Sequence, residues 1–355
     1  MSGIQLPRGI YNSIKDWASA VNSPKVYLKE IYPPTTFSRR IRRPPTQYPK
    51  VLEGGNVGII PNGRVWGLNG AIITPDNHLI WDVSLEMVHP RTKHSIFEKE
   101  MLPPITDYYE QVADLTHVVA NNYYHWMYEV IPRVHLLHQS GIDVDRFIVK
   151  SQQVDLPFQS ETLNQLGIKE HQFIWTDCHF HIQSKNLVVP SQPSFATKWG
   201  YEFLRKTFLT GEAPTNKVGK RIYISRKWAR RITNEDALMD VLSKFGFVKV
   251  ELETLSVAEQ AQLFSSAEII VAAHGAGLVN LTFCQPGTKV IEIFSPTYIT
   301  SLYWVISSLG NLMHYYFIGG LGERDDIQLE NNWVGLDNIT VNISKFKAFL
   351  RGLRI

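Results

Sequence analysis

Two titratable residues, His125 and Glu129, stand four positions apart in the segment NNYYHWMYEVIPR. On a helix this spacing places both side chains on one face. A carboxylate within reach of an imidazole fixes the imidazole tautomer and raises its basicity, and histidine titrates closest to neutral pH. The pair therefore has the chemistry of a general base that takes a proton from a hydroxyl group. His125 is the first candidate for this base and Glu129 the second; the alternative is a buried core histidine among aromatic neighbours.

A second candidate site lies in AEIIVAAHGAGLVNLTFCQPGTKVIEIF, residues 267–294. The pattern predicts a buried strand, a glycine turn, a short helix and a second buried strand. A glycine turn between a strand and a helix presents backbone N–H groups at the positive end of the helix, which suits phosphate. The expected ligands are the N–H groups of Gly275, Ala276 and Gly277 and a side chain from His274 or Asn280.

Four cations follow a short predicted strand in RIYISRKWARRITN, residues 221–234. A metal-free site holds a departing diphosphate with cations and helix ends, and arginine suits this because its planar guanidinium engages two oxygens at once. Any single cation of this run could be a solvated surface charge, which we expect of Lys227 and Arg230; Arg226, at the end of the strand, is the candidate to bind a diphosphate. Glu292, at the end of the second buried strand, has two open interpretations: a hydrogen bond to ribose hydroxyls or a structural pair with a cation.

Taken in order, these segments resemble glycosyltransferase family 61 (DUF563). The resemblance rests on the N-Y-Y-H-W helix that ends in E-x-x-P-R and on the later Y-I-S-R, N-E, G-F, L-S-x-x-E-Q and H-G-A-G-L-x-N motifs, and it covers roughly residues 63–296. The matching residues of the later motifs are Tyr223 to Arg226, Arg231, Asn234, Glu235, Gly246, Phe247, Leu255, Ser256, Glu259, Gln260, His274 to Leu278, Asn280 and Glu292.

The resemblance implies an inverting, metal-independent glycosyltransferase of the GT-B type that uses a nucleotide-sugar donor, with UDP as the expected nucleotide. The expected acceptor is a hydroxyl of a glycan or glycoconjugate in surface-polysaccharide synthesis, and no cofactor or metal is expected. The implied donor-site set is Arg226, Arg231, Asn234, His274, Gly275, Ala276, Gly277, Asn280 and Glu292. The implied acceptor-site set is Tyr124, Trp126 and Arg133, where the rings offer stacking faces and the arginine alternatively pairs with Glu129.

At 355 residues the chain is long enough for two domains of ordinary size. We expect a basic, Pro-rich arm over residues 1–50, an acceptor-side α/β domain over 51–212 and a nucleotide-sugar-binding Rossmann-like domain over 213–355. We expect both domains to be doubly wound and to face a central cleft. An alternative for the C-terminal segment is that it packs against the first domain. Within the first domain we expect a strand over 118–120 that leads into a helix over 122–139.

The net charge of +3 is unevenly distributed, because residues 1–50 hold nine Lys or Arg against two acidic residues. Two interpretations apply to the cluster of Arg39, Arg40, Arg42 and Arg43: contact with anionic lipid or a solvated arm. The solvated arm is favoured because no apolar anchor accompanies the charge. The sequence shows neither a membrane span nor a secretory signal, and two cysteines form no disulfide scaffold. We therefore expect a bacterial-type cytoplasmic protein, with peripheral contact to the inner face of the membrane as the alternative.

Two short motifs suggest a metal site, and we discount both. Asp143 and Asp145 form a D-x-D pair in a predicted loop, and Cys178, His179 and His181 lack the wider spacing of a zinc site. Two other classes of protein remain as alternatives. The first is a nucleotide-binding protein without catalysis. The second is an NAD-dependent oxidoreductase, which the missing third glycine of the G-x-G-x-x-G fingerprint disfavours.

Overall fold

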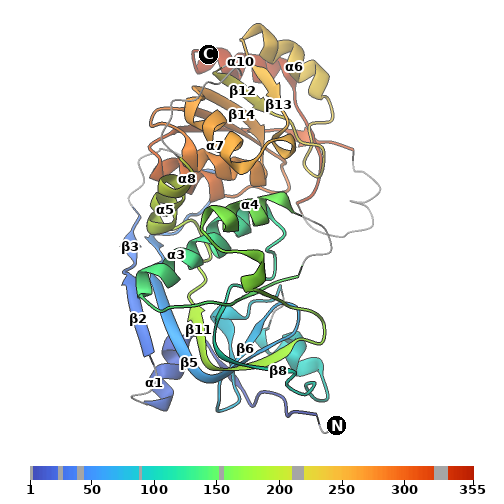
Figure 1. Cartoon of the computed structure of the whole chain (residues 1–355). Coiled ribbons are helices and arrows are strands. Elements are labelled where there is room, and N and C mark those ends of the chain that lie inside the picture. Colours follow the sequence, from blue (N-terminus) through green and yellow to red (C-terminus); the bar gives the residue numbers. More distant parts are fainter. Residues whose placement is uncertain are drawn as a thin grey trace. The chain divides into compact units, whose positions relative to one another are not determined.

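The computed structural model describes residues 3–22, 27–37, 44–87, 90–151, 156–209, 220–323 and 335–355 (Figure 1). Contacts divide the chain into two compact units. Unit 1 consists of Met1–Thr35 and Val51–Phe203, and unit 2 consists of Thr36–Lys50 and Leu204–Ile355. No helix in the described ranges is long and apolar enough to cross a membrane.

Unit 1 is built on a nine-stranded mixed sheet. The strand order is β1-β7-β6-β5-β11-β8-β9-β10, and β2 also pairs with β5. The strands are β1 (Ile10–Tyr11), β2 (Tyr27–Tyr32), β5 (Gly55–Trp66), β6 (Ala71–Ile73), β7 (Leu79–Ile80), β8 (Asp107–Asp114), β9 (Phe147–Val149), β10 (Phe173–Trp175) and β11 (His181–Pro190). β11 is the central strand, antiparallel to β5 and parallel to β8. Alternate side chains of β5 and β11, such as Val65 and Ile182, meet in one apolar core.

The helices of unit 1 connect these strands. They are α1 (Ile14–Val21), α2 (Tyr123–His125), a π-helix (Trp126–Val130), α3 (Ile131–Ser140), α4 (Pro157–Gln165) and the 3₁₀ turns Trp81–Val83, Arg91–Lys93, Ser95–Glu98 and Glu170–Gln172; α5 (Lys198–Phe208) follows at the boundary between the units. The predicted helix over 122–139 is present as α2, the π-helix and α3. The predicted strand over 118–120 is wrong: the chain turns there, and the strand that pairs with β11 is the preceding β8.

Unit 2 is built on a five-stranded parallel sheet in the order β13-β12-β14-β15-β16. Its strands are β12 (Arg221–Ile224), β13 (Val248–Val250), β14 (Ile269–Ala273), β15 (Lys289–Phe294) and β16 (Met313–Ile318). Numbered along the chain, this is the doubly wound order 2-1-3-4-5. The connections leave β12 and β14 in opposite directions, so a crevice opens at the carboxyl ends of these two strands, where ligands of such sheets bind.

The helices of unit 2 are α6 (Glu235–Lys244), α7 (Val257–Ser266), α8 (Leu302–Leu309) and α10 (Ile343–Gly352), with 3₁₀ helices at Leu252–Thr254 and Ala276–Phe283. α6 and α10 cover one face of the sheet, because Leu238 and Phe346 pack with Val271 and Ile291 in one core. α7 and α8 pack against the 3₁₀ helix Ala276–Phe283. Two small pairs, β3 (Thr35–Thr36) with β4 (Val51–Leu52) and β17 (Gly320–Leu321) with β18 (Ile339–Thr340), complete the secondary structure.

Three expectations about organisation differ from this architecture. Unit 1 is a mixed sheet with antiparallel β2, β5 and β6, and so it is not doubly wound as expected. The residues assigned to a basic arm over 1–50 form β1, α1 and β2 of unit 1, since Ile14 and Trp17 are apolar enough to be buried there, while 36–50 belong to unit 2. The C-terminal helix α10 packs in the core of unit 2. Arg39, Arg40, Arg42, Arg43 and the boundary expected at 212/213 lie outside the described residues.

Candidate active site

The start of the helix that holds the candidate base, and its π-helical turn, are both explained by residues within the segment. Asn122 caps it, because its side-chain oxygen accepts a hydrogen bond from the backbone N–H of Tyr124 at 2.9 Å. The π-helix Trp126–Val130 follows directly. Pro132 explains the wider turn, since it has no N–H to donate to the carbonyl four residues earlier and its ring crowds that carbonyl. π-turns of this kind are frequent at functional sites.

This helix brings Glu129 between two histidines. His125 Nδ1 lies 2.6 Å from Glu129 Oε2, and His117 Nε2 lies 2.8 Å from the same oxygen. The two imidazole rings stack with centroids 5.5 Å apart at 24°. His117 and Glu129 are buried, whereas the side chain of His125 is 34% exposed. The structure therefore brings the predicted pair together and adds His117, which the sequence analysis missed.

His117 could have been suspected from its position just past the carboxyl end of a strand. The strand predicted over 118–120 lies after His117, whereas the strand in the structure, β8, ends before it at Asp114. Polar residues that follow a buried strand lie where α/β proteins place their sites. An error of a few residues in one strand thus concealed the third member of the cluster.

The hydrogen bonds around this cluster fix its tautomers. The N–H of Val119 donates to His117 Nδ1 at 3.2 Å, so His117 carries its proton on Nε2 and donates it to Glu129. His125 Nδ1 donates to the same carboxylate. The lone pair of His125 is then on Nε2, which makes no hydrogen bond to a described residue. A partly exposed imidazole whose free nitrogen points away from its carboxylate has the arrangement of a general base.

The charges in the cluster are consistent with this assignment. Burial acts to raise the pKa of Glu129, but hydrogen bonds from His117 and His125 outweigh it, and the pKa is lowered below its usual range. Burial lowers the pKa of His117 against the attraction of the Glu129 carboxylate. Glu129 is therefore ionised and His117 neutral near pH 7, which leaves one negative charge to orient and stabilise His125.

His117, His125 and Glu129 also form a group whose ligand atoms lie within 4.8 Å of one another, close enough to suggest a metal site. The donor set fits a metal poorly. A metal ligand must offer a lone pair, yet His117 Nδ1 already accepts the Val119 N–H and its Nε2 holds the proton. Within the described part of the chain no other group of three or more such ligands occurs, and Asp143, Asp145 and Cys178 are not part of this one.

The predicted acceptor-side residues are mostly buried. Arg133 has no exposure and pairs with Asp114, with Nη2 2.8 Å from Oδ2, while Nη1 donates to the carbonyl of Thr116. It therefore does not pair with Glu129. Tyr124 is 3% exposed, with its ring packed edge-on against His125 at 5.3 Å. Trp126 is 1% exposed and donates from Nε1 to Thr162 Oγ1 at 2.8 Å.

The glycine turn of unit 2 lies in the crevice between β12 and β14. A pocket there is lined by Ile224, Ser225, Arg226, Leu252, Glu253, Ala272, Ala273, Gly275, Gly277 and Leu278. The N–H groups of Gly275, Ala276 and Gly277 have no acceptor among the described residues. An ideal Cβ on Gly275 would stand 1.6 Å from Arg226 Nη1, so only glycine lets the guanidinium lie against this turn. The structure thus assembles the turn and Arg226 in one place.

Two arginines share this end of the sheet. Arg226 donates from Nε to the carbonyls of Trp228 and Ala229, and its terminal nitrogens have no acceptor among the described residues. Burial and, to a lesser extent, the nearby Arg230 together lower its pKa to about 10. Arg230 donates to the carbonyls of His274 and Gly335 and lies over the ring of Tyr298. Two neighbouring, partly buried cations of this kind favour a bound anion.

Arg230 was expected at the surface, and the structure corrects that expectation. Ala229 and Arg230 have φ of 37° and 55°, a left-handed bend that turns the Arg230 side chain back toward the end of β14. Lys227 is exposed and pairs with Glu251, as expected of a solvated charge. Arg231 pairs through its backbone with Asn338 and Ile339.

The amides of Asn234 and Asn280 are engaged in holding the backbone and a neighbouring helix. Asn234 bonds to both the carbonyl and the N–H of Val341. Asn280 is fully buried and donates to Gln260 Oε1 on α7 and to the carbonyl of Gly277. Asn234 therefore helps to hold the start of α6, and Asn280 helps to hold the glycine turn.

His274 belongs to a buried chain of hydrogen bonds. Its Nδ1 lies 2.5 Å from Glu292 Oε1, Glu292 Oε2 lies 3.0 Å from His314 Nε2, and His314 Nδ1 lies 2.8 Å from Ser307 Oγ. Glu292 has no exposure and holds an imidazole on each oxygen, a geometry that favours the structural interpretation over contact with ribose. Burial opposes ionisation of Glu292, but the hydrogen bonds from both histidines keep its pKa lowered.

The ring of His274 packs against Phe294, Tyr298 and Tyr303 at centroid distances of 5.1–5.3 Å. Burial lowers its pKa, and the arginine charges add to that effect against the pull of Glu292. Its Nε2 makes no hydrogen bond to a described residue, on a side chain that is only 4% exposed. The sequence analysis did not identify His314 or Ser307, because nothing local marks a strand histidine and a helix serine as partners.

Comparison with known proteins gives a family match and several partial relatives. A family model described as Glycosyltransferase 61 matches residues 123–291. The beta-1,2-xylosyltransferase RCN11 of Oryza sativa subsp. japonica is 28% identical over 99 residues, 26% of this chain and 19% of that protein. The xylan glycosyltransferase MUCI21 of Arabidopsis thaliana is 31% identical over 81 residues, 22% of this chain and 16% of that protein.

A third relative is the protein O-linked-mannose beta-1,4-N-acetylglucosaminyltransferase 2 of Takifugu rubripes, 32% identical over 101 residues, 26% of this chain and 17% of that protein. The chain spans less than a fifth of the length of each of these relatives. The family match includes His125, Glu129, Arg226 and His274. Over this segment, which contains these site residues, the chain is similar to glycosyltransferase family 61.

Proposed function

We propose that this protein transfers a sugar from a nucleotide-sugar donor to a hydroxyl group of a glycan or glycoconjugate, with inversion and without a bound metal. Unit 2 would bind the donor and unit 1 the acceptor, in an arrangement of the GT-B type. The observation that supports this most strongly is the crevice at β12 and β14, where three backbone N–H groups have no acceptor among the described residues and Arg226 Nη1 lies against Gly275.

In the proposed donor site, Arg226 and the turn at Gly275–Gly277 bind the diphosphate. Negative charge grows on the diphosphate as the bond to the sugar breaks, and preorganised donors stabilise that charge without reorganisation. Arg230 adds a second cation at the same strand ends. We expect UDP as the nucleotide and a hexose or pentose as the sugar.

His274 would assist the same step. A bound diphosphate near Nε2 would favour the protonated imidazole, and Glu292 would balance the added positive charge through its 2.5 Å contact with Nδ1. His314 and Ser307 hold the other side of Glu292 and so keep the carboxylate oriented. In this proposal Glu292 positions His274, and it does not contact the nucleotide.

On the acceptor side, His125 Nε2 would take the proton of the attacking hydroxyl. The acceptor oxygen forms a bond to the anomeric carbon while the bond from that carbon to the diphosphate oxygen breaks, and the diphosphate leaves with the electron pair. The hydroxyl proton passes to His125, whose positive charge is stabilised by Glu129. Glu129 is less suited to act as the base, since its accepting oxygen is already bonded to two histidines.

The setting of the reaction is also a proposal. One relative is named as a xylosyltransferase, one as a xylan glycosyltransferase and one as an N-acetylglucosaminyltransferase of O-linked mannose, which suggests a carbohydrate acceptor here. We propose surface-polysaccharide synthesis in the cytoplasm. Alternatively, the protein binds peripherally to the inner face of the membrane through Arg39, Arg40, Arg42 and Arg43.

A thermal-shift panel with UDP, GDP, CMP and NAD tests the proposed nucleotide class. We expect stabilisation by a nucleoside diphosphate, loss of that shift in Arg226→Ala, and no loss in the matched control Lys227→Ala, because Lys227 is exposed and paired with Glu251. Stabilisation by NAD alone would support an oxidoreductase and contradict the proposal.

A donor screen that measures released nucleotide tests for catalysis. Nucleotide binding without release from any sugar donor, with or without oligosaccharide acceptors, would favour a binding protein without catalysis. We expect EDTA to leave turnover intact. Loss of turnover on EDTA that Mn²⁺ restores would reject the metal-independent mechanism and return attention to Asp143 and Asp145.

A further inference from the structure

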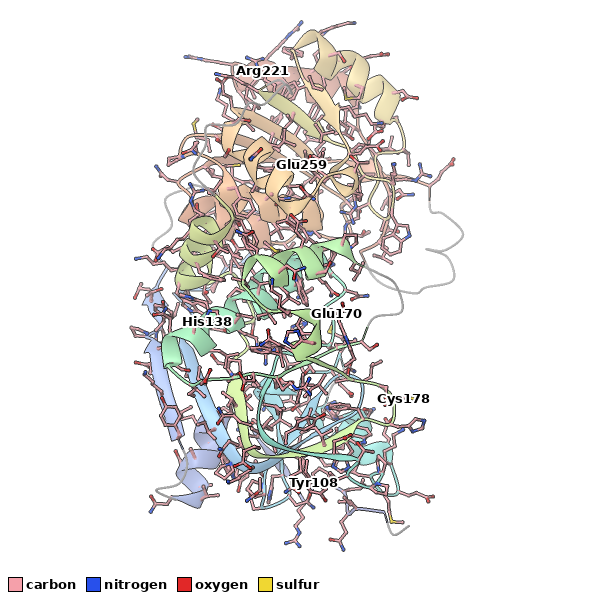
Figure 2. The ribbon with its side chains drawn as sticks, viewed as in Figure 1. Tyr108, His138, Glu170, Cys178, Arg221 and Glu259 are labelled. Atoms are coloured by element: carbon pink, nitrogen blue, oxygen red, sulfur yellow. The ribbon has the colours of Figure 1, made fainter. Side chains whose placement is uncertain are left out.

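A cavity of about 280 Å³ lies in unit 1 beside helix α4. It is lined by Trp126, Leu156, Gln159, Ser160, Leu163, Asn164, Ile168, Glu170, Phe173 and Trp175. Figure 2 shows Glu170 close to α4. The volume is near the lower end for small-molecule sites, roughly 300–1,000 Å³, and is of the size needed for a single sugar residue. None of the roles assigned above uses this cavity.

Aromatic rings form one part of its lining. Trp175 ends strand β10 with 45% of its surface exposed, which is unusual for so large an apolar side chain. Its orientation is restrained by an edge-to-face contact with Phe173 at 5.5 Å and 65°. Trp126 lines the cavity from a buried position, with 1% exposure and Nε1 bonded to Thr162, so Trp175 is the more accessible ring. Such a ring presents a flat apolar face to the C–H face of a sugar.

Polar groups form the other part, and several are available for a ligand. The side chains of Asn164 and Glu170 make no hydrogen bond to a described residue. The amide of Gln159 is fixed, because its Nε2 donates to the carbonyl of Ala120 at 2.9 Å, and its Oε1 accepts no hydrogen bond from the described part of the chain. A few fixed polar groups among aromatic rings match the alternating hydroxyl and C–H surface of a carbohydrate.

The charge of the lining restricts the class of sugar. Glu170 is its one ionisable side chain, and no cation is among the lining residues. A carboxylate accepts hydrogen bonds from sugar hydroxyls but repels the carboxylate of a uronic acid. The cavity therefore fits a neutral sugar.

We propose that this cavity binds a neutral sugar residue of the acceptor glycan, separate from the residue that receives the transferred sugar. The proposal rests on the proposed function and deepens it. The same helical segment places His125 and lines the cavity through the adjacent Trp126. Occupation of the cavity would favour oligosaccharide acceptors over monosaccharides, because a second bound residue adds contacts outside the reacting bond.

A microarray of neutral and uronic-acid-containing oligosaccharides of increasing length tests this inference. We expect the wild-type protein to bind neutral oligosaccharides and not monosaccharides. Trp175→Ala and Asn164→Ala should each weaken binding of the neutral oligosaccharide for which the wild-type protein has the highest affinity. For Trp175→Ala we expect a loss of at least about tenfold. Trp175→Phe keeps an aromatic face and should retain most of the wild-type affinity. The matched control is Tyr108→Ala, an aromatic residue of β8 that is 72% exposed and lies at the other end of unit 1 from Glu170 in Figure 2.

UDP-induced thermal shifts of the same variants separate the two proposals and report folding. Normal UDP shifts with oligosaccharide binding unaffected by Trp175→Ala and Asn164→Ala would overturn the inference and leave the proposed function standing. The same conclusion follows if the wild-type protein binds UDP but no glycan on the array. Absence of nucleotide binding by the wild-type protein would reject the proposed function itself. Equal loss of glycan binding in Tyr108→Ala would also contradict the assignment to this cavity.

Discussion

His125 lies in an aromatic-rich helix, where its sequence context fits a core histidine as well as a base. Its protonation pattern separates these roles, because the Val119 N–H directs the proton of His117 to Nε2 and both histidines then donate to Glu129. The free nitrogen of His125 faces away from the carboxylate on a side chain that is 34% exposed. A buried and fully bonded histidine would have no such nitrogen to offer.

Removal of the imidazole tests this role at the residue scale. In His125→Ala we expect turnover to fall by roughly 10²–10⁴, the contribution of a general base, while the UDP-induced thermal shift is unchanged. His138→Ala is the matched control, since His138 is an exposed histidine near the end of α3. Released nucleotide measured against time would show the difference. Near-normal turnover of His125→Ala would eliminate it as the base.

Asp82 provides a pH-dependent prediction about stability. Burial, with added repulsion from Asp16 and Glu53, raises its pKa to about 7, and its Oδ1 has no hydrogen-bond partner. Because an unfolded aspartate titrates near roughly 3.9, the stabilising contribution of protonated Asp82 is full below about pH 4 and is lost as the pH rises through 7. We expect Asp82→Asn to raise the free energy of unfolding at pH 8, by at most about 4 kcal/mol.

At pH 5 the same substitution should have a much smaller effect, since the native aspartate is then largely protonated. Denaturant unfolding of both proteins at pH 5 and pH 8 measures this difference. Asp143→Asn is the control, because Asp143 is exposed in a loop. An equal effect of Asp82→Asn at the two pH values would contradict the raised pKa.

At the scale of elements, the turn after β14 shows how a short segment becomes a binding site. The parallel register aligns the ends of β12 and β14, with Ile224 opposite Ala272. The side chain that follows β12 and the backbone that follows β14 therefore meet at one edge of the sheet. Gly275 has an extended backbone, with φ of 174°, so the requirement for glycine there comes from the close approach of Arg226 and not from strain.

Gly275→Ala tests this close approach. A Cβ would stand 1.6 Å from Arg226 Nη1, so the guanidinium must move from the turn. We expect UDP binding to weaken by at least about tenfold, as for loss of one charge-assisted contact, while the melting temperature without ligand falls little. The control is Gly352→Ala at the end of α10, where a Cβ meets no atom within 4 Å. Unchanged UDP affinity in Gly275→Ala would argue against diphosphate binding at this turn.

At the scale of the whole molecule, each unit has its own sheet and core, and neither is continuous in sequence. Residues 36–50 belong with the C-terminal half. Phe37 is buried beside Trp304 of α8 at 6.0 Å, and Thr46 exchanges hydrogen bonds with Ser301. The N-terminal basic segment therefore includes part of the core of unit 2.

Phe37→Ala tests this contribution. We expect a loss of about 3–5 kcal/mol in the free energy of unfolding, the usual cost of truncating a buried phenylalanine to alanine. Val51→Ala is the control, since Val51 is 53% exposed. Denaturant unfolding followed by circular dichroism gives both values. A loss in Phe37→Ala no larger than in Val51→Ala would show that residues 36–50 contribute little to unit 2.

Several features of this protein were determined by the sequence alone, because they depend on local patterns. Apolar runs bounded by glycine predicted β14 and β15, and the i, i+4 spacing predicted the contact of His125 with Glu129. The motifs also indicated the family whose model matches residues 123–291.

Only the tertiary structure decided which distant residues complete these sites. His117 joins Glu129, His314 joins Glu292, and Arg230 turns back to His274, each across a sequence separation that no local pattern records. The position of β11 between β5 and β8 was equally hidden, because strand pairing depends on how separated segments meet and not on the periodicity within each one. Hydrogen bonds between strands and loops that are distant in sequence therefore determined the final composition of each site.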